Sequence, residues 1–172
     1  MSEFYISVPT DVLVNDLAII ASLVIIGLVI WFYSEGTDRV MGTGILGIVI
    51  IIFIYLSLIA PAQTKVVLDD DTLIVSIPPY GHETVKKEEI RRIYVVDLEY
   101  DENLRPKSKK FGKGTRSYKK GWYKLTNGRD AMMMTTGTKV VCLELDDRYI
   151  MLSPDRFDDF VEELNEKFMA VG

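Results

Sequence analysis

The chain has few of the residues that catalytic and metal sites commonly use. It contains one cysteine, Cys142, and one histidine, His82, among 172 residues. A single cysteine excludes an intramolecular disulfide, and structural zinc sites need several cysteine or histidine ligands. We interpret Cys142 as a packed thiol in a strand and His82 as a loop residue. No catalytic residues, metal ligands or cofactor are therefore predicted, and we expect a protein that is not an enzyme.

Charged residues are absent from two apolar runs near the front of the chain, residues 17–33 and 43–60. A helix rises about 1.5 Å per residue, so each run covers most of a hydrocarbon core of about 30 Å. The link between them is short enough to require a turn. The runs predict a hairpin of two transmembrane helices with both chain ends on one side. A helix pair without ionisable residues does not favour an ion path or a transporter site.

The orientation of this hairpin is weakly determined by charge. The first sixteen residues contain no lysine or arginine, so they lack the basic region of a secretory signal peptide, and we expect the first helix to be retained. Arg39 lies in the link and Lys65 follows the second helix. Each side of the hairpin therefore has one nearby basic residue, and the positive-inside rule does not favour either orientation. We expect the soluble domain in the cytoplasm because of a basic segment described below.

Residues 63–172 predict one soluble domain, and residues 1–62 the N-terminal segment with its hairpin. Short segments with alternating apolar side chains indicate a series of strands. Asn127-Gly128 between two such segments predicts a β-hairpin with a type I′ turn. Ser153 is expected to cap a final amphipathic helix, with Pro154 at its first position. Strands followed by one helix predict an α+β domain.

The second half of this domain resembles a known family. Residues 121–128 read GWYKLTNG, and residues 149–155 read YIMLSPD before the helical stripe. This combination resembles the bacterial and archaeal PH-like domain proteins, over about residues 65–168. The resemblance implies two nearly orthogonal antiparallel sheets, a β-sandwich or barrel, capped by a C-terminal helix and joined to a membrane hairpin. It implies no catalytic residues, and it does not transfer lipid specificity, because fold does not fix function.

A basic segment, expected to be a long loop over residues 99–120, is the strongest local feature. Between Asn103 and Asn127 there are nine lysines and arginines and no acidic residue. The remaining residues sum to −14, since the whole chain carries −5. Glycines in the segment are expected to keep it flexible. The candidate binding residues are Lys107, Lys109, Lys110, Lys113, Arg116, Lys119, Lys120 and Trp122, with Tyr118 in support.

These features predict a membrane-anchored binding or adaptor module of the cell membrane. Its basic side chains would contact anionic lipid headgroups, each contributing about 1 kcal/mol near such a surface. An acidic protein partner and a solvated loop without a ligand are alternative interpretations. Nucleic acid is not expected as a partner, because the rest of the chain is acidic. A second hypothesis is a structural accessory subunit of a larger membrane protein complex, with the hairpin packed on partner helices.

Overall fold

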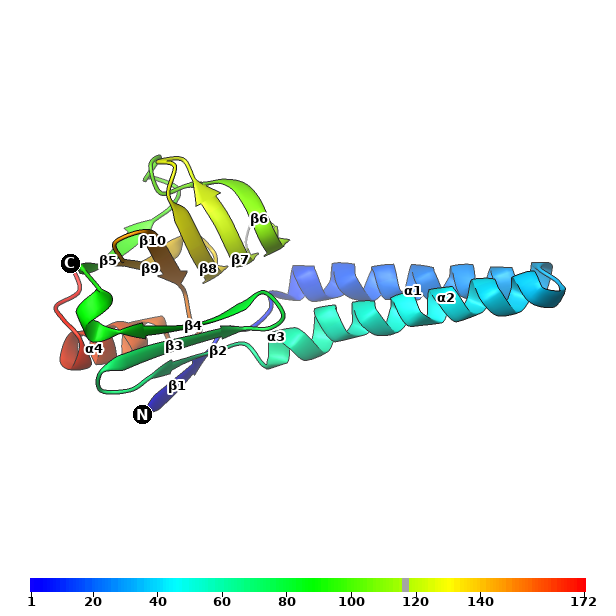
Figure 1. Cartoon of the computed structure of the whole chain (residues 1–172), viewed down its shortest axis with the longest axis horizontal. Helices are drawn as coiled ribbons and strands as arrows, with labels where there is room; N and C mark the ends of the chain where they lie inside the picture. The colour runs from blue at the N-terminus through cyan, green and yellow to red at the C-terminus, as the bar shows by residue number, and fades with distance from the viewer. Residues whose placement is uncertain (116–117) are drawn as a thin grey trace. The chain divides into compact units, whose positions relative to one another are not determined.

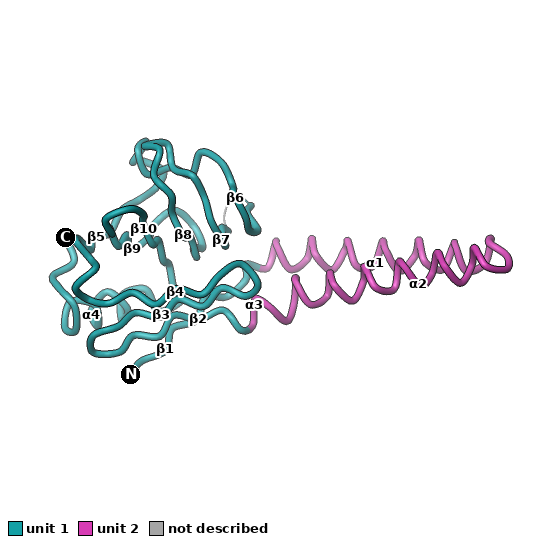
Figure 2. The backbone as a smooth tube through the Cα atoms, viewed as in Figure 1, with its two compact units in different colours: residues 1–9, 63–172 teal, residues 10–62 magenta. Residues whose placement is uncertain are grey.

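The computed structural model describes residues 1–115 and 118–172. Two compact units make up the chain, one of residues 10–62 and the other of residues 1–9 with 63–172 (Figure 2). The sequence interpretation grouped residues 1–62 together, whereas the first nine residues belong to the β-rich unit. We describe each unit by itself.

The first unit is a helical hairpin (Figure 1). Helix α1 covers Thr10–Tyr33, and α2 covers Gly36–Ile54. A π-helical turn, Tyr55–Ile59, and the short helix α3, Ala60–Ala62, continue the second arm. Both arms are longer than the apolar runs predicted, because their polar flanks also adopt helical backbone. The reversal takes two residues and uses Gly36 at φ +56°, and Pro61 lies within α3 instead of ending the arm at residue 60.

Both arms are long and apolar enough to cross a membrane by length and composition. Many of their apolar side chains face outward, such as Ile25 at 61% exposure and Ile51 at 68%. The arms approach each other closely at two glycines. A Cβ added at Gly27 would lie 3.1 Å from Leu46 Cδ2, and one at Gly42 would lie 3.1 Å from an Ile30 methyl. Small residues thus permit close helix packing, while the outer surface remains apolar.

The second unit contains two sheets and a helix. The first sheet has the order β1-β2-β3-β4, and every neighbouring pair is antiparallel. Its strands are Ser2–Tyr5, Lys65–Leu68, Thr72–Ile77 and Gly81–Lys86. A 3-10 helix, Lys87–Glu89, leads to the second sheet.

The second sheet has the order β5-β9-β10-β8-β7-β6. Its strands are Arg92–Asp97 (β5), Pro106–Gly114 (β6), Tyr118–Leu125 (β7), Asp130–Thr136 (β8), Lys139–Glu144 (β9) and Arg148–Leu152 (β10). Strands β8 and β10 run parallel, and the other neighbours are antiparallel. Helix α4, Phe157–Lys167, follows this sheet. The predicted α+β class is confirmed.

Side-chain alternation in the second sheet separates two apolar cores. Met132 and Met134 belong to a core that includes the first sheet and α4, whereas Met133 belongs to a second cluster on the other face. All three methionines are buried, as a strand with both faces covered requires. Leu104, from the segment between β5 and β6, joins the second cluster and helps to cover that face.

Strand β1 was not predicted from the sequence. Phe4 is buried and stacks edge-on against Phe160 of α4, with ring centroids 5.0 Å apart. The carboxylate of Asp155 accepts hydrogen bonds from the Ser7 N–H at 3.0 Å and the Ser7 hydroxyl at 2.6 Å. The alternation of buried Phe4 and Ile6 with exposed Tyr5 is the period of two that could have revealed this strand.

The prediction that Ser153 caps the last helix is wrong. Helix α4 begins at Phe157, after both Ser153 and Pro154. The Ser153 hydroxyl instead accepts the Thr136 N–H at 2.9 Å and donates to the Thr136 carbonyl at 2.8 Å. This serine therefore ties the end of β10 to the end of β8, a long-range contact that a local capping pattern does not reveal.

The β-hairpin at Asn127-Gly128 forms, but the type I′ turn prediction is wrong. Gly128 has a φ of +84°, while no non-glycine residue in the described part of the chain has a positive φ. The Gly128 N–H donates to the Leu125 carbonyl at 3.0 Å, and the Leu125 N–H donates to the Arg129 carbonyl at 2.9 Å. This pattern indicates a three-residue loop in which glycine takes the left-handed position.

Candidate anion-binding surface on strands β6 and β7

The basic segment is mainly a β-hairpin, so the prediction of a long loop over residues 99–120 is wrong. Strand β6 pairs with β7 at the edge of the second sheet. Gly112 and Gly121 face each other across this pair, with φ of +145° and +123°. A Cβ at Gly112 would overlap the Lys120 carbonyl, and one at Gly121 would overlap the Phe111 carbonyl. These glycines permit a close approach of two paired strands. The expectation that they keep a loop flexible is therefore wrong.

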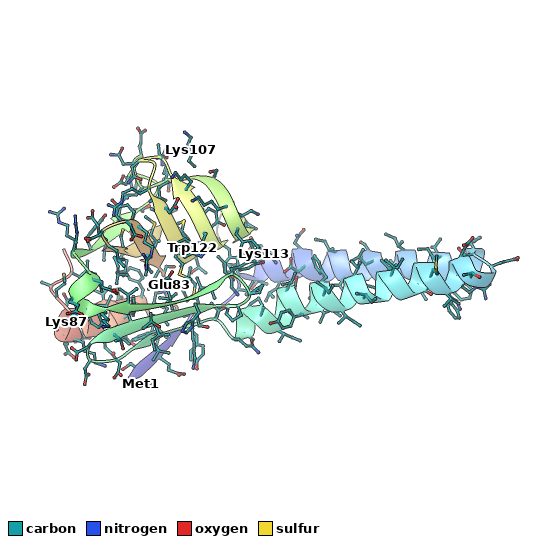
Figure 3. The ribbon with its side chains drawn as sticks, viewed as in Figure 1. Met1, Glu83, Lys87, Lys107, Lys113 and Trp122 are labelled. Carbon is teal, nitrogen blue, oxygen red and sulfur yellow. The ribbon has the colours of Figure 1, made fainter. Side chains whose placement is uncertain are left out.

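Strand pairing divides the candidate residues between two faces of this hairpin. The register places Phe111 opposite Trp122, and Lys113 opposite Lys120. We call this the aromatic face, and it also includes Tyr80, Lys110 and Lys124. Lys107, Lys109, Lys119 and Tyr123 line a pocket on the hairpin, and we call this side the lysine face. Figure 3 labels Lys107 and Lys113, which lie toward opposite ends of β6.

On the aromatic face, part of the positive charge is already paired. Lys110 Nζ lies 2.6 Å from one carboxylate oxygen of Asp130, and Lys124 Nζ lies 3.5 Å from the other. The ammonium of Lys110, and to a lesser extent Lys124, holds the pKa of Asp130 below its usual value. Phe111 is 57% exposed and contacts Tyr80 edge-on, with ring centroids 5.3 Å apart. This face therefore presents an aromatic surface on which one carboxylate offsets part of the positive charge.

Lys120 is not part of the accessible basic surface. Its side chain is 1% exposed, and Nζ donates to the Thr64 hydroxyl at 2.5 Å. Burial, with a smaller effect of the nearby Lys113 charge, lowers the pKa of Lys120 to about 8. Tyr118 is also buried, and Arg116 lies outside the described residues.

On the lysine face, the pocket has a volume of about 190 Å³. Lys107 and Lys109 are exposed at its rim, and neither forms an ion pair with any carboxylate in residues 1–115 and 118–172. Lys119 is partly buried, which lowers its pKa. The Tyr123 hydroxyl donates to the Lys113 carbonyl at 2.9 Å. Positive charge is thus concentrated on the lysine face. At Lys107 and Lys109, no carboxylate among the described residues offsets it.

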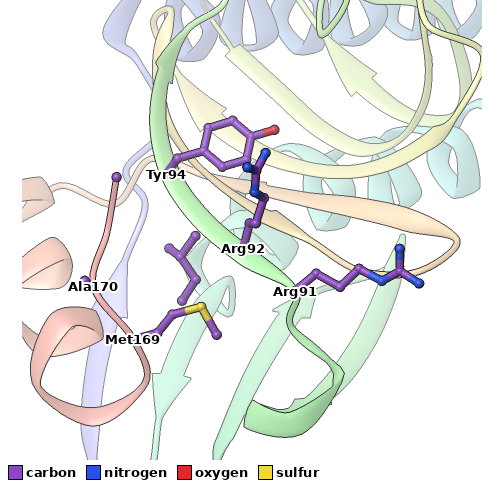
Figure 4. Close-up of a pocket in the computed structure, with 7 residues that line it drawn as sticks. Arg91, Arg92, Tyr94, Met169 and Ala170 are labelled. Atoms are coloured by element: carbon purple, nitrogen blue, oxygen red, sulfur yellow. The ribbon is translucent and has the colours of Figure 1, made fainter.

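A second hollow of about 420 Å³ lies beside the outer edge of β5 (Figure 4). Arg91, Arg92 and Met169 contribute to its wall, and Arg91 forms an ion pair with Asp146. The C-terminal Gly172 pairs with this edge: its N–H donates to the Ile93 carbonyl at 3.0 Å. The sequence carried no signal for this hollow, because its walls come from segments more than seventy residues apart.

The single cysteine and the single histidine of the sequence lie outside strands β6 and β7. Cys142 is completely buried in β9, and burial raises the pKa of its thiol to about 12. His82 lies exposed in β4, which corrects its expected position in a loop. Among the described residues, no group of three histidine, cysteine or acidic side chains is arranged to hold a metal ion.

Comparison with known proteins identifies the family of the β-rich unit. A family model described as the bacterial PH domain matches residues 64–168, more than half of the chain. No curated protein and no solved structure matches the chain. The matched region begins next to β2 and ends just after α4, so it includes both sheets except for β1. Two apolar helices precede this region, and the chain belongs to the bacterial PH domain family.

Proposed function

We propose that this protein is a membrane-anchored binding module whose β6–β7 hairpin contacts anionic lipid headgroups at the cytoplasmic face of the cell membrane. PH-like domains are generally binding modules and not catalysts, which supports the general class. The observation that carries the finer proposal is the pair Lys107 and Lys109, exposed on an edge strand and unpaired with any described carboxylate.

The proposed contact does not need to be strong. Each lysine near an anionic leaflet contributes about 1 kcal/mol, and the attraction decays within a Debye length. The apolar hairpin would hold the domain at the bilayer, so binding is effectively intramolecular and a weak contact is populated often. The exposed outward apolar side chains of α1 and α2 support this anchoring role, since water would solvate them poorly.

The direct test compares lipids that co-purify with the full chain in polymer-bounded native membrane particles. A Lys107→Gln/Lys109→Gln variant should retain less anionic lipid than the wild type. A Lys86→Gln/Lys110→Gln variant removes the same charge from two lysines that already pair with Glu88 and Asp130, and should retain nearly the wild-type amount. Equal anionic lipid content in all three proteins would contradict the proposal.

A second candidate function is a structural accessory subunit of a membrane complex. Gly44 and Gly47 support it, because a Cβ added at either position meets no atom within 4 Å and leaves room for another helix. Native mass spectrometry of the same particles distinguishes the two functions. A stoichiometric protein partner, together with lipid content unaffected by the lysine changes, would favour the accessory subunit.

A further inference from the structure

We propose that the lysine-face pocket is a subsite for a single phosphoryl group. This inference rests on the proposed function and specifies the chemistry that the β6–β7 hairpin would recognise. The pocket is lined by Pro106, Lys107, Ser108, Lys109, Gly114, Thr115, Lys119 and Tyr123.

Strand register explains why the lysines surround an open space. Lys109 pairs with Tyr123, and Gly114 pairs with Lys119 further along the same two strands. Between these pairs lie Gly112 and Gly121, which have no side chains to fill the surface. Gly121 is buried, and the Tyr123 ring extends along this side to the Lys113 carbonyl, so the open space lies between Lys109 at one end and Lys119 at the other. Irregular pairing beside Ser108 also brings Lys107 into the lining.

A threonine hydroxyl adds hydrogen-bonding capacity to the pocket. Ser108 and Thr115 both line it, and of the two only Thr115 contributes a hydroxyl there, because the register places Ser108 opposite Lys124 on the aromatic face. The Thr115 hydroxyl oxygen accepts the Tyr118 N–H at 3.2 Å, so the hydroxyl hydrogen can still be donated to an anion. The Tyr123 hydroxyl already donates to the Lys113 carbonyl, which fixes the ring as one wall. The side-chain donors on this side are therefore the lysines and Thr115.

The size and charge of the pocket favour a phosphoryl group over larger or neutral ligands. Its volume of about 190 Å³ is below the roughly 300–1,000 Å³ typical of sites for drug-sized ligands. A phosphate monoester carries a charge of about −1.5 to −2 and three strong acceptor oxygens, which suits three lysines with an adjacent hydroxyl donor. Partial burial lowers the pKa of Lys119, and a bound dianion would counteract that effect.

The first test measures the protection of individual lysines from an amine-acetylating reagent by mass spectrometry. The full chain is placed in phosphatidylcholine nanodiscs, and inorganic phosphate is compared with chloride at equal ionic strength. We expect phosphate to slow modification of Lys109 and Lys119 by about five-fold or more, while Lys86 and Lys110 change little. Equal protection of all four lysines would indicate general charge screening and overturn the inference.

Two variants separate the pocket from general charge. Lys119→Gln should abolish phosphate protection at Lys109, whereas Lys110→Gln, with the same charge change on the aromatic face, should preserve it. Gly114→Ala leaves the charge intact but adds a Cβ that would overlap the Tyr123 hydroxyl, so it should also abolish protection. Thermal unfolding is measured for each variant, and Lys119→Gln decides the outcome if Gly114→Ala does not fold. Protection that survives Lys119→Gln would contradict the pocket assignment.

The source of the phosphoryl group is tested by changing the lipid. Nanodiscs containing phosphatidic acid present a phosphate monoester, whereas phosphatidylglycerol presents only a diester. Protection of Lys109 and Lys119 by phosphatidic acid beyond that by phosphatidylglycerol identifies a lipid source, and protection by free phosphate alone identifies a soluble one. Protection by neither overturns the inference. The proposed function survives that result if Lys107→Gln/Lys109→Gln still reduces anionic lipid content, and otherwise fails with it.

Discussion

Lys120 and Cys142 are both buried in the β-rich unit, and burial affects their protonation in the same physical way. In each case the low-polarity surroundings disfavour the charged form. For a lysine this lowers the pKa, to about 8 at Lys120, while for a thiol it raises the pKa, to about 12 at Cys142. Both shifts lead to a measurable consequence.

The buried Lys120 should make stability depend on pH in the alkaline range. Below about pH 8 the side chain is protonated in both states, whereas between about 8 and its ordinary value of 10.5 the unfolded chain binds more protons. The free energy of unfolding should therefore rise as pH increases through this window, by at most about 3 kcal/mol. Denaturant unfolding of the wild type and of Lys120→Met, in one detergent, measures the effect. If the free energy of unfolding of the wild type rises with pH no more steeply than that of Lys120→Met, the explanation is contradicted.

The thiol of Cys142 should be unreactive in the folded protein. It is fully buried, and its raised pKa leaves little thiolate at pH 8. A maleimide reagent should therefore modify the folded chain at least about a hundred-fold more slowly than the chain in denaturant. Rapid labelling without denaturant, detected by intact mass, would show that β9 is more accessible than this structure indicates.

At the scale of the secondary-structure elements, pairing of β6 with β7 depends on two glycines. Gly121→Ala should destabilise the β-rich unit by more than about 2 kcal/mol, because the new Cβ overlaps a backbone carbonyl at a positive φ. Gly128→Ala is the matched control, since it also has a positive φ but meets no atom within 4 Å. It should cost only about 1–2 kcal/mol. Thermal and denaturant unfolding compare the two variants, and equal costs would argue against the close approach.

Strand β1 should contribute strongly to the first core. Phe4→Ala removes a buried ring that stacks on Phe160, and such changes typically cost about 3–5 kcal/mol. Tyr5→Ala, on the exposed side of the same strand, should cost much less. A small effect of Phe4→Ala on denaturant unfolding would mean that β1 is not a stable part of the sheet.

Local sequence patterns predicted some elements well and missed others for physical reasons. Alternation identified β3, and the β-hairpin around Asn127-Gly128 follows from turn chemistry, because both signals are local. Strand β1 was missed because it pairs with a strand about sixty residues away, and no local pattern indicates that partner. Strand β6 consists largely of lysine and glycine, which have low strand propensity, and pairing with β7 outweighs that preference.

The candidate site was predicted as a set of residues but not as an arrangement. Composition alone identified the basic segment, whose nine cations stand out from the rest of the chain. It could not show that Lys120 is buried or that Asp130 pairs with Lys110, because both depend on tertiary contacts. The register of β6 against β7 separates Lys107, Lys109 and Lys119 from the remaining candidates.

At the scale of the whole molecule, one segment with nine cations and no acidic residue stands out from a chain whose net charge is −5. Attraction between the β6–β7 hairpin and an anionic surface should weaken with salt, since the Debye length falls from about 30 Å at 0.01 M to about 8 Å at 0.15 M. The apolar arms should be insensitive to salt, because hydrophobic burial does not depend on charge pairing. Salt therefore separates anchoring from headgroup recognition.

The most direct measurement of the central claim places a fluorophore on strand β6 of the basic hairpin. Ser108→Cys adds an exposed thiol between Lys107 and Lys109, while the natural Cys142 stays buried. In nanodiscs with nitroxide-headgroup lipid, we expect the fluorophore at position 108 to be quenched when phosphatidylglycerol is present and released by salt. A fluorophore introduced by Asp70→Cys, in the turn between β2 and β3, should change little. Quenching at position 108 that is independent of anionic lipid, or no stronger than at position 70, would contradict headgroup recognition by the β6–β7 hairpin.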